Sequence, residues 1–389
     1  MSIALRILPF LLLITVMFFY PQEVLKSAST GLSLWANFVL PALFPFFIIS
    51  DLLMKQGFVH FLGALLEPFM RPVFHLPGKA SFVVAMTHTS GIPIGAILTC
   101  KMRKDGEITK TEGERLLAFT SNPSPGFMFG AVASGMLGNP TLGIILAGSV
   151  YISNLIVGFL FRFYGLANDN HSTYPFSFRK AWNELALIQE KNKKPFGAML
   201  ADAVRDSTST ILLVGGFIVF FSVITQMITV LHINTIFSAG TTVLTRGLLP
   251  PSGGNALIQG FLETTLGCKA AVTAFGSLNA KVGMLSFLMG WGGLSVFAQV
   301  ASFTTTTDLR FYPFVLGRCL HACLAFVTSQ VLLRFSEIPT LKLPVTLTGM
   351  ENGWIFTLKL SCYYFFWIIL ILLIVGLTYK MSKRVIRKR

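Results

Sequence analysis

Thr87-His88-Thr89-Ser90-Gly91-Ile92-Pro93-Ile94-Gly95 interrupts an apolar segment of the chain with Gly, Pro and hydroxyl side chains. Ser121-Asn122-Pro123-Ser124-Pro125-Gly126 interrupts the next apolar segment in the same way. In lipid, a broken helix exposes backbone N–H and C=O groups, and this is costly unless protein or a water-filled cavity receives them. Paired broken segments in the two halves of a membrane chain are a sequence indication of a transport site. We therefore expect a membrane transporter whose site lies at these interruptions.

The composition predicts an all-α polytopic membrane protein. Of the 389 residues, 53% are hydrophobic and only 12% are charged, whereas soluble domains are roughly 25% charged. Several apolar runs reach about 20 residues, the length of a helix that spans a bilayer. The net charge is +15, and six of the 31 basic residues lie in Lys380–Arg389, directly after an apolar run. That placement fits the positive-inside rule, so we expect no nucleic-acid partner.

We expect about eight transmembrane helices plus two re-entrant hairpins, arranged in two weakly similar repeats. The chain is predicted to begin with an N-terminal transmembrane anchor at 1–31, followed by a first repeat at 32–165 with a hairpin near 80–102. A polar connector with an amphipathic helix at 166–207 and a linking span at 208–231 join this repeat to the second. The second repeat covers 232–379 with a hairpin near 286–303, and a basic cytoplasmic tail follows at 380–389. The spans include Leu32–Met54 and Trp354–Tyr379. Whether the repeats are parallel or inverted depends on whether Gly253–Cys268 crosses the membrane, and the sequence leaves both topologies open.

Three short matches in the same order favour an internal repeat. Ser90–Gly95 matches Gly292–Phe297, Arg115 matches Arg318, and Ala118–Asn122 matches Ala325–Gln330.

Several strings resemble the nucleoside-recognition, or Gate-domain, family, and within it the sporulation membrane proteins. They are Ser90-Gly91-Ile92-Pro93-Ile94-Gly95, Glu112-x-Glu114-Arg115-Leu116-Leu117-Ala118-Phe119, Asn122-Pro123-x-Pro125 and Phe261-Leu262-Glu263-x-Thr265-Leu266-Gly267-Cys268-Lys269. The resemblance covers roughly residues 33 to 335. It implies a fold similar to concentrative nucleoside transporters and a source in an endospore-forming bacterium. It also implies passage of dipicolinate (pyridine-2,6-dicarboxylate) from mother cell toward forespore across the outer forespore membrane. The family's usual Asn-Asn or Asn-Ala at the helix break is replaced here by Ser121-Asn122-Pro123-Ser124-Pro125.

The expected substrate is a small anionic aromatic molecule bound at the interruptions. A half-helix that begins at the Ser90–Gly95 break presents unpaired N–H groups and a positive dipole end, which suit a carboxylate. The alternative is a structural kink packed against neighbouring helices. The expected substrate-binding residues are Thr89, Ser90, Gly91, Pro93, Arg115, Ser121, Asn122, Ser124, Gly292, Gly293, Ser295, Gln299 and Arg318.

Three charged residues and two histidines lie within apolar segments, and each has two possible roles. Arg115 and Arg318 either extend toward lipid headgroups or face one cavity as a pair, where guanidinium groups bind both carboxylates of dipicolinate. Glu263 either binds a coupling H⁺ or Na⁺ or pairs with an arginine such as Arg318. His88 and His321 either relay protons or pack within the bundle.

The sequence lacks the motifs of two classes of membrane protein, ATP-driven pumps and intramembrane metalloproteases. The sequence contains no GxxxxGK[ST] phosphate loop and no HExxH motif, so we expect neither ATP-driven pumping nor an intramembrane metalloprotease. No enzymatic activity, cofactor or metal site is expected. The cysteines form no CxxC pair and are expected to be buried small hydrophobic residues: Cys100, Cys268, Cys319, Cys323 and Cys362.

The alternative functions are a nucleoside or nucleobase carrier and a non-transporting membrane scaffold for spore assembly. The sequence also leaves open whether the protein forms a homo-oligomer.

Overall fold

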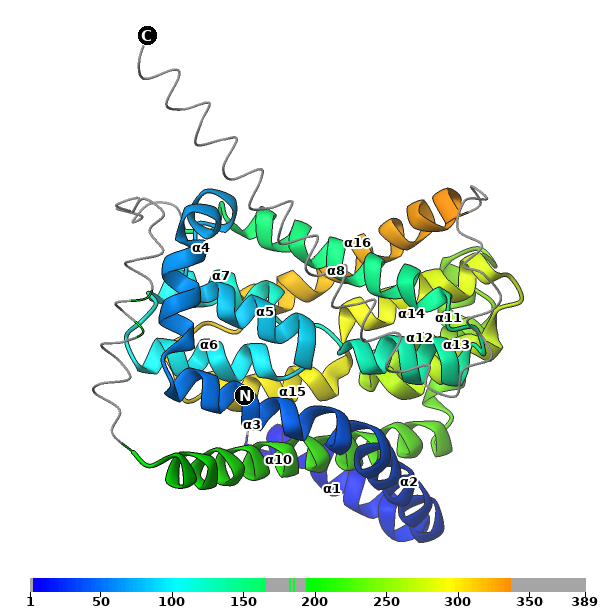
Figure 1. The fold of residues 1–389 in the computed structure, drawn as a ribbon. Coiled ribbons are helices and arrows are strands. Elements are labelled where there is room, and N and C mark those ends of the chain that lie inside the picture. Colours follow the sequence, from blue (N-terminus) through cyan, green and yellow to red (C-terminus); the bar gives the residue numbers. More distant parts are fainter. Residues whose placement is uncertain (1–2, 166–181, 183–184, 186–193, 337–389) are drawn as a thin grey trace, which may run out of the picture. The chain divides into compact units, whose positions relative to one another are not determined.

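The computed structural model describes residues 3–165, 182, 185 and 194–336, and every element it assigns there is helical (Figure 1). One compact unit extends to Leu333 and contains all the predicted site residues. The predicted span Trp354–Tyr379, the basic tail 380–389 and most of the connector 166–193 lie outside the described residues.

The N-terminal helices are α1 (Ile3–Phe19), α2 (Pro21–Leu34), the π-helical turn η1 (Trp35–Val39), α3 (Leu40–Lys55) and α4 (Phe58–Phe74). Pro21 is the first residue of α2, where a missing N–H costs nothing. The chain bends by 104° there. The helix that contains the predicted span Leu32–Met54 therefore begins earlier, at Pro21, and passes through a π-helical turn before α3.

The first half of the bundle starts with a hairpin where the sequence predicts one. Its arms are α5 (Ala80–Ser90) and α6 (Ile94–Lys104). Gly91 has φ +88°, a conformation that glycine adopts without strain. A β-carbon on Gly95 would lie 2.5 Å from Thr87 Oγ1, and residues eight apart meet in this way only if the chain turns back.

The hairpin is followed by a broken helix and then by an unbroken one. The broken helix consists of α7 (Lys110–Phe119) and the π-helical η2 (Gly126–Met136), and the unbroken helix is α8 (Leu142–Phe161). Thr109 and Glu112 form a capping box at the start of α7, which satisfies two N–H groups of the first turn.

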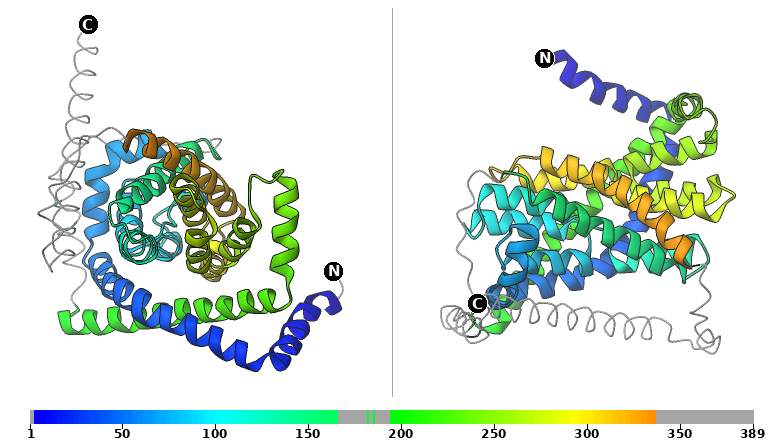
Figure 2. Two further views of the ribbon diagram at one scale, coloured as in Figure 1. Left: turned by 90° about the vertical axis from the view of Figure 1, so that its right-hand side faces the viewer. Right: turned by 90° about the horizontal axis from the view of Figure 1, so that it is seen from above.

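The second half contains α10 (Phe196–Val230), α11 (Ile233–Leu244), α12 (Pro251–Leu262), α13 (Thr264–Ala274), α14 (Leu278–Trp291), α15 (Gly293–Thr304) and α16 (Tyr312–Ser336). The helix α10 packs against α2 and α3, and these helices lie beside the bundle that contains the two hairpins and the broken helices (Figure 2). The amphipathic helix expected up to residue 207 and the linking span expected at 208–231 are one continuous helix, α10.

The second hairpin does not lie near 286–303, and this prediction is wrong. The hairpin is α12–α13, which reverses at the extended backbone of Glu263. A β-carbon on Gly267 would collide with the Cα of Gly260 in the facing arm. In contrast, α14 and α15 together form one candidate span of 27 residues, Leu278–Thr304. The positive φ angles of Gly292 and Gly293 (+91° and +79°) interrupt this helix without reversing it.

Both halves therefore have the same order of elements: a hairpin, a broken helix and an unbroken helix. The hairpin α5–α6 corresponds to α12–α13, which lies on the other side of the unit in Figure 1. The match of Ser90–Gly95 with Gly292–Phe297 pairs a hairpin tip with a helix break, so it is wrong. The match of Arg115 with Arg318 is also wrong, because Arg115 lies in the broken helix α7 and Arg318 in the unbroken helix α16.

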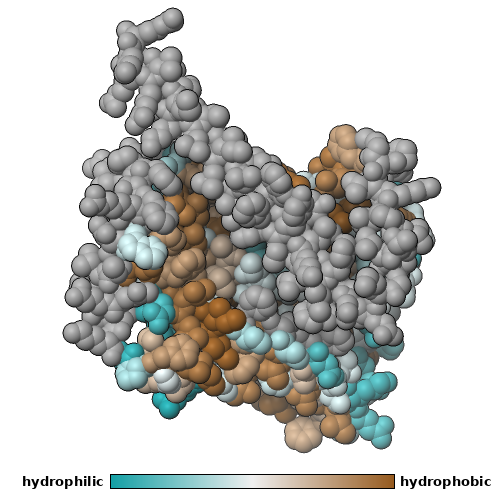
Figure 3. All heavy atoms as spheres, in the orientation of Figure 1, coloured by the Kyte–Doolittle hydropathy of each residue, from teal (hydrophilic) through white to brown (hydrophobic). Residues whose placement is uncertain are grey.

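The helices confirm a polytopic membrane protein. Four are long and apolar enough to cross a membrane (Leu142–Phe161, Phe196–Val230, Leu278–Thr304 and Tyr312–Phe335), and up to six if each of two bent helix pairs counts as one span. We predict about eight, one of which lies outside the described residues. Apolar side chains cover much of the described surface on the face in Figure 3.

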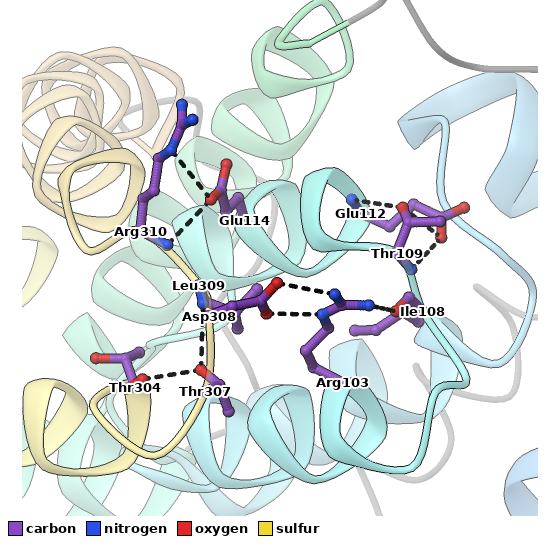
Figure 4. A network of polar contacts seen from close by, with 10 residues as sticks. All are labelled: Arg103, Ile108, Thr109, Glu112, Glu114, Thr304, Thr307, Asp308, Leu309 and Arg310. Atoms are coloured by element: carbon purple, nitrogen blue, oxygen red, sulfur yellow. Dashed lines mark hydrogen bonds and ion pairs between the residues drawn. The ribbon is translucent and has the colours of Figure 1, made fainter.

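Ion pairs connect the two halves at the α6–α7 turn (Figure 4). The guanidinium of Arg103 donates to both carboxylate oxygens of Asp308 at 2.8 and 2.9 Å, and also to the carbonyl of Ile108 at 3.0 Å. The carboxylate of Glu114 on α7 accepts the backbone N–H of Arg310 at 3.0 Å. The loop between α15 and α16 is thereby held against the α6–α7 turn. The Arg103 guanidinium lowers the pKa of Asp308 to about 2.

Gly267→Ala should destabilise the protein, because its methyl group would meet the Cα of Gly260 and force the arms of the second hairpin apart. We expect a cost of about 1–3 kcal/mol, typical of overpacking. Gly216→Ala on α10 is the matched control, since a β-carbon there has nothing within 4 Å. Thermal unfolding of the detergent-solubilised protein measures both. Equal midpoints for the two variants would contradict the close approach of α12 and α13.

Asp308→Asn should lower the free energy of unfolding by up to about 1 kcal/mol at pH 7, as expected for an exposed ion pair. The folded pKa of Asp308 lies below its unfolded value of about 3.9. The stabilisation is therefore fully present above pH 4 and is lost as the pH falls through about 2. It should also decrease in 1 M salt, since salt screens surface charges. Asp105→Asn, at an exposed acid in the same turn, is the control. A destabilisation by Asp308→Asn that persists at pH 2 and in high salt would refute an electrostatic origin.

Candidate functional site

Each hairpin tip packs against the break of the helix that follows it. A β-carbon on Gly91, at the first tip, would lie 2.7 Å from the backbone N of Ser124 in the first break. A β-carbon on Gly293, in the second break, would lie 3.0 Å from the N of Thr264 and 3.1 Å from the carbonyl of Leu262 at the second tip. The interruptions in the two halves therefore form two tip-and-break pairs.

An apolar cluster connects the first hairpin to the second broken helix. Ala96 of α6 is buried together with Val296 and Phe297 of α15. Ile92 at the first tip and Leu294 in the first turn of α15 pack against the same cluster. Because this cluster contains the ends of both elements, the first hairpin tip lies close to the second helix break.

Five buried hydroxyl or amide oxygens at these interruptions have no hydrogen-bond partner in the described structure. They are Thr87 Oγ1, Ser90 Oγ, Ser121 Oγ, Asn122 Oδ1 and Thr264 Oγ1. The first four residues are at most 1% exposed, and Thr264 is 9% exposed. A buried polar group without a partner costs about 1–3 kcal/mol. The arrangement is therefore suited to a polar ligand or ion that supplies the missing partners.

Most of the predicted substrate-binding residues gather at the two tip-and-break pairs. Ser90, Gly91 and Pro93 form the first tip, and Ser121, Asn122 and Ser124 lie in the first break. Gly292 and Gly293 form the second break, and the buried Ser295 and Gln299 follow it on α15. Thr89 does not join them, because it is exposed and its hydroxyl bonds to the carbonyls of Ala85 and Met86 in its own helix.

The helix N-terminus best placed to receive an anion is that of α15. Its N-cap residue is Gly292, which provides no side-chain cap, so the first N–H groups of the helix lack partners within it. The sequence points instead to α6, but there the N–H groups of Ile94 and Ala96 bond to the carbonyls of Gly91 and Pro93. In the other two half-helices, Glu263 caps α13, and the N–H of Phe127 in η2 bonds to a serine hydroxyl.

Glu263 is buried at the second tip and acts as the N-cap of α13. One carboxylate oxygen accepts the N–H of Leu266 at 2.8 Å, and the other accepts the hydroxyl of Thr265 at 3.1 Å. Among the described residues no basic side chain pairs with it, so the ion pair with Arg318 that we considered is not present. Its charge is compensated by local dipoles alone.

Arg115 and Arg318 are both buried, and both bind backbone carbonyls. Arg115 donates from Nε to Tyr164 O at 2.7 Å and from Nη1 to His75 O at 2.9 Å. Arg318 donates to carbonyls at the two helix breaks. The two side chains share none of these acceptors. Neither side chain extends to the surface, and the expectation that the two arginines face one cavity stays a prediction.

Asn154 and Tyr151 on α8 are two further polar residues near the first tip and break, and neither was expected from the sequence. Both amide atoms of Asn154 are buried without a partner, and its side chain is 0% exposed. The hydroxyl of Tyr151 donates to the carbonyl of His88 at 2.8 Å, and the His88 ring lies 3.4 Å from the amide nitrogen of Asn122. Asn154 could have been found from sequence, because an amide in the middle of an apolar span needs a partner.

The cysteines follow the expectation only in part. Cys100 and Cys268 are buried, whereas Cys319 and Cys323 are exposed one turn apart on α16. Cys362 lies outside the described residues. Within the described part of the chain, no group of three or more His, Cys, Asp or Glu side chains could hold a metal ion.

Comparisons with known proteins identify a family model and relatives that match this chain. The family model for the Gate domain, described as nucleoside recognition, matches residues 38–140, which include the first hairpin and the first break. An uncharacterized protein of Alkalihalophilus pseudofirmus is 32% identical over 78 residues, or 19% of this chain and 17% of that protein. No solved structure matches.

A further relative covers most of the chain. The sporulation integral membrane protein YlbJ of Bacillus subtilis is 42% identical over 329 residues, or 83% of this chain and 81% of that protein. The aligned length is enough to include both hairpins and both broken helices. This chain is thus a multi-pass integral membrane protein and belongs to the family of the sporulation integral membrane protein YlbJ.

Proposed function

We propose that this protein is a secondary transporter needed for spore formation, and that it moves dipicolinate from the mother cell toward the forespore across the outer forespore membrane. The observation that carries the proposal is the meeting of two hairpin tips with two helix breaks, where buried hydroxyl and amide oxygens lack partners. Interrupted helices at membrane depth are found where they line a substrate or ion pathway. The sporulation role of a relative that covers four-fifths of the chain supports the substrate assignment.

The carboxylates of dipicolinate would bind at the start of α15. Its uncapped N–H groups and positive dipole end attract an anion. The hydroxyl of Thr264 lies at the adjoining tip and has no partner in the described structure. Since both arginines bind backbone carbonyls, the proposal assigns carboxylate recognition to the helix end and its hydroxyls.

Glu263 gives a physical reason for proton coupling. Its Cα lies 3.2 Å from where a β-carbon of Gly293 would be, so the residue adjoins the proposed anion site. Two like charges so close together disfavour each other. Binding of the anion would therefore take up a proton on Glu263. Na⁺ is the alternative coupling ion, and the unpartnered oxygens of Thr87, Ser90, Ser121 and Asn122 would hold it.

A nucleoside or nucleobase carrier is the second candidate. The match of residues 38–140 to a family described as nucleoside recognition favours it. Neutral hydroxyl and amide groups, such as those of Ser90 and Asn122, suit the hydrogen-bonding edges of a base, and a charged Glu263 would not repel a neutral ligand.

Proteoliposomes that contain only this protein should take up labelled dipicolinate saturably, without competition from uridine. An inward proton gradient should accelerate the uptake, and Glu263→Gln should remove this acceleration while a sodium gradient has no effect. Acceleration by sodium alone would replace H⁺ by Na⁺ as the coupling ion. Uptake of uridine in place of dipicolinate would establish the nucleoside carrier. If neither ligand crosses although the protein is folded, the lone-carrier mechanism is wrong and a scaffold role becomes the better explanation.

Ser90→Ala should raise the KM for the transported ligand by about three- to tenfold, the loss expected for one hydrogen bond. Ser81→Ala is the matched control, because Ser81 lies on the same helix α5 and is also buried without a partner, but in the first turn, away from the tip. Its KM should equal that of the unmodified protein. Equal effects of the two substitutions would argue against a ligand at the first tip.

A further inference from the structure

Arg318 lies where both broken helices meet α16, and its side chain is only 1% exposed. Gly317 precedes it in the chain. A β-carbon on Gly317 would collide with the carbonyl of Ala118 near the end of α7. The glycine therefore allows α16 to approach this end closely and carries Arg318 to the first helix break.

The guanidinium of Arg318 donates to carbonyls of both breaks. Nε donates to Trp291 O and Nη2 to Met289 O, each at 2.9 Å, and both acceptors belong to the last turn of α14. Nη1 donates to the carbonyl of Ser121, just after the end of α7. The last carbonyls of a helix have no partner within the helix. One side chain therefore satisfies carbonyls at two helix ends that lie far apart in the sequence.

The two helix ends also compensate the charge of Arg318. A helix C-terminus carries a partial negative charge, and α7 and α14 both end at this guanidinium. Among the described residues no carboxylate forms an ion pair with Arg318. Arginine has five N–H donors in a planar fork and no acceptor, which fits a set of carbonyls that approach from different helices.

His321 extends the same network to α8. Its Nδ1 lies 3.1 Å from Nη1 of Arg318, and its Nε2 lies 2.8 Å from the carbonyl of Val150. Since the guanidinium can only donate, Nδ1 accepts, and the hydrogen of the neutral ring is on Nε2, which donates to Val150. Arg318 and His321 thus connect α7, α14, α8 and α16 at the level of the breaks.

We propose that Arg318 is a positioning residue that holds both helix breaks in the geometry of the site, and that it does not itself bind the substrate. The inference rests on the proposed function in one respect, because it takes the two helix breaks as part of the transport site. Loss of the guanidinium leaves carbonyls at both breaks without partners, so both breaks open to water together. Transport is then impaired whether the transported ligand is anionic or neutral.

Cysteine labelling tests this directly. In a variant without native cysteines, Ser121→Cys and Ser295→Cys place buried reporters at the first and second break. Arg318→Gln should raise the rate of labelling by a water-soluble maleimide about tenfold at both reporters, because each unpartnered carbonyl favours local opening. Arg115→Gln is the matched control. It removes an equally buried arginine from the carbonyls of two other chain segments, and both labelling rates should stay unchanged.

Arg318→Lys separates charge from geometry. An ammonium group keeps the positive charge but lacks the planar fork, so it reaches fewer of the carbonyls and labelling should be intermediate. If folded Arg318→Gln and Arg318→Lys both leave the two reporters unreactive, the inference is overturned. If Arg318→Gln fails to fold while Arg115→Gln folds, the network is required for the fold itself, which supports the positioning role.

Transport kinetics give an independent readout. The inference requires Arg318→Lys to lower the maximal rate of whichever ligand is transported and to leave its KM unchanged. A rise in KM for dipicolinate alone would instead identify Arg318 as a substrate ligand. The labelling experiment needs no transport, so absence of uptake in the unmodified protein would count against the proposed function and not against this inference.

Discussion

The structure depends on one constraint, which is that backbone N–H and C=O groups need partners wherever a helix is interrupted away from water. This chain interrupts its helices at two hairpin tips and two breaks, and each interruption is satisfied differently. Each tip packs against the following break, Glu263 caps α13, and Arg318 receives carbonyls from α7 and α14. Two buried charged side chains, Glu263 and Arg318, therefore bond to backbone groups at the interruptions.

The candidate site is defined by the buried polar groups that have no partner, as opposed to those that bond to the backbone. The charged groups of Arg115, Arg318 and Glu263 are occupied by protein atoms, whereas neutral oxygens of Ser90, Asn122 and their neighbours are not. A ligand at this place would meet hydroxyls, amides and a helix N-terminus. Recognition by such groups relies on fixed dipoles, whose orientation the surrounding helices maintain without further reorganisation.

The sequence allowed prediction of the all-helical membrane class, the first hairpin and the first break, because Gly, Pro and hydroxyl residues interrupt apolar runs there. It did not distinguish the second hairpin from the second break. Gly292-Gly293 is the more obvious interruption, yet the chain reverses at Glu263, where the facing Gly260 and Gly267 allow close contact of the arms. Likewise, which oxygen meets a guanidinium depends on helices distant in sequence, so the partners of Arg115 and Arg318 could not be predicted.

The two halves reach the same order of elements by different local chemistry, and this asymmetry has a consequence for function. The first tip satisfies the N–H groups of α6 with its own carbonyls and leaves neutral oxygens free. The second tip places Glu263 beside the uncapped start of α15. The first half thus offers oxygen ligands and the second offers N–H donors next to a titratable acid. An anion together with a proton would suit the second half and a cation the first, so under the proposed function the two possible coupling ions predict binding in different halves of the bundle.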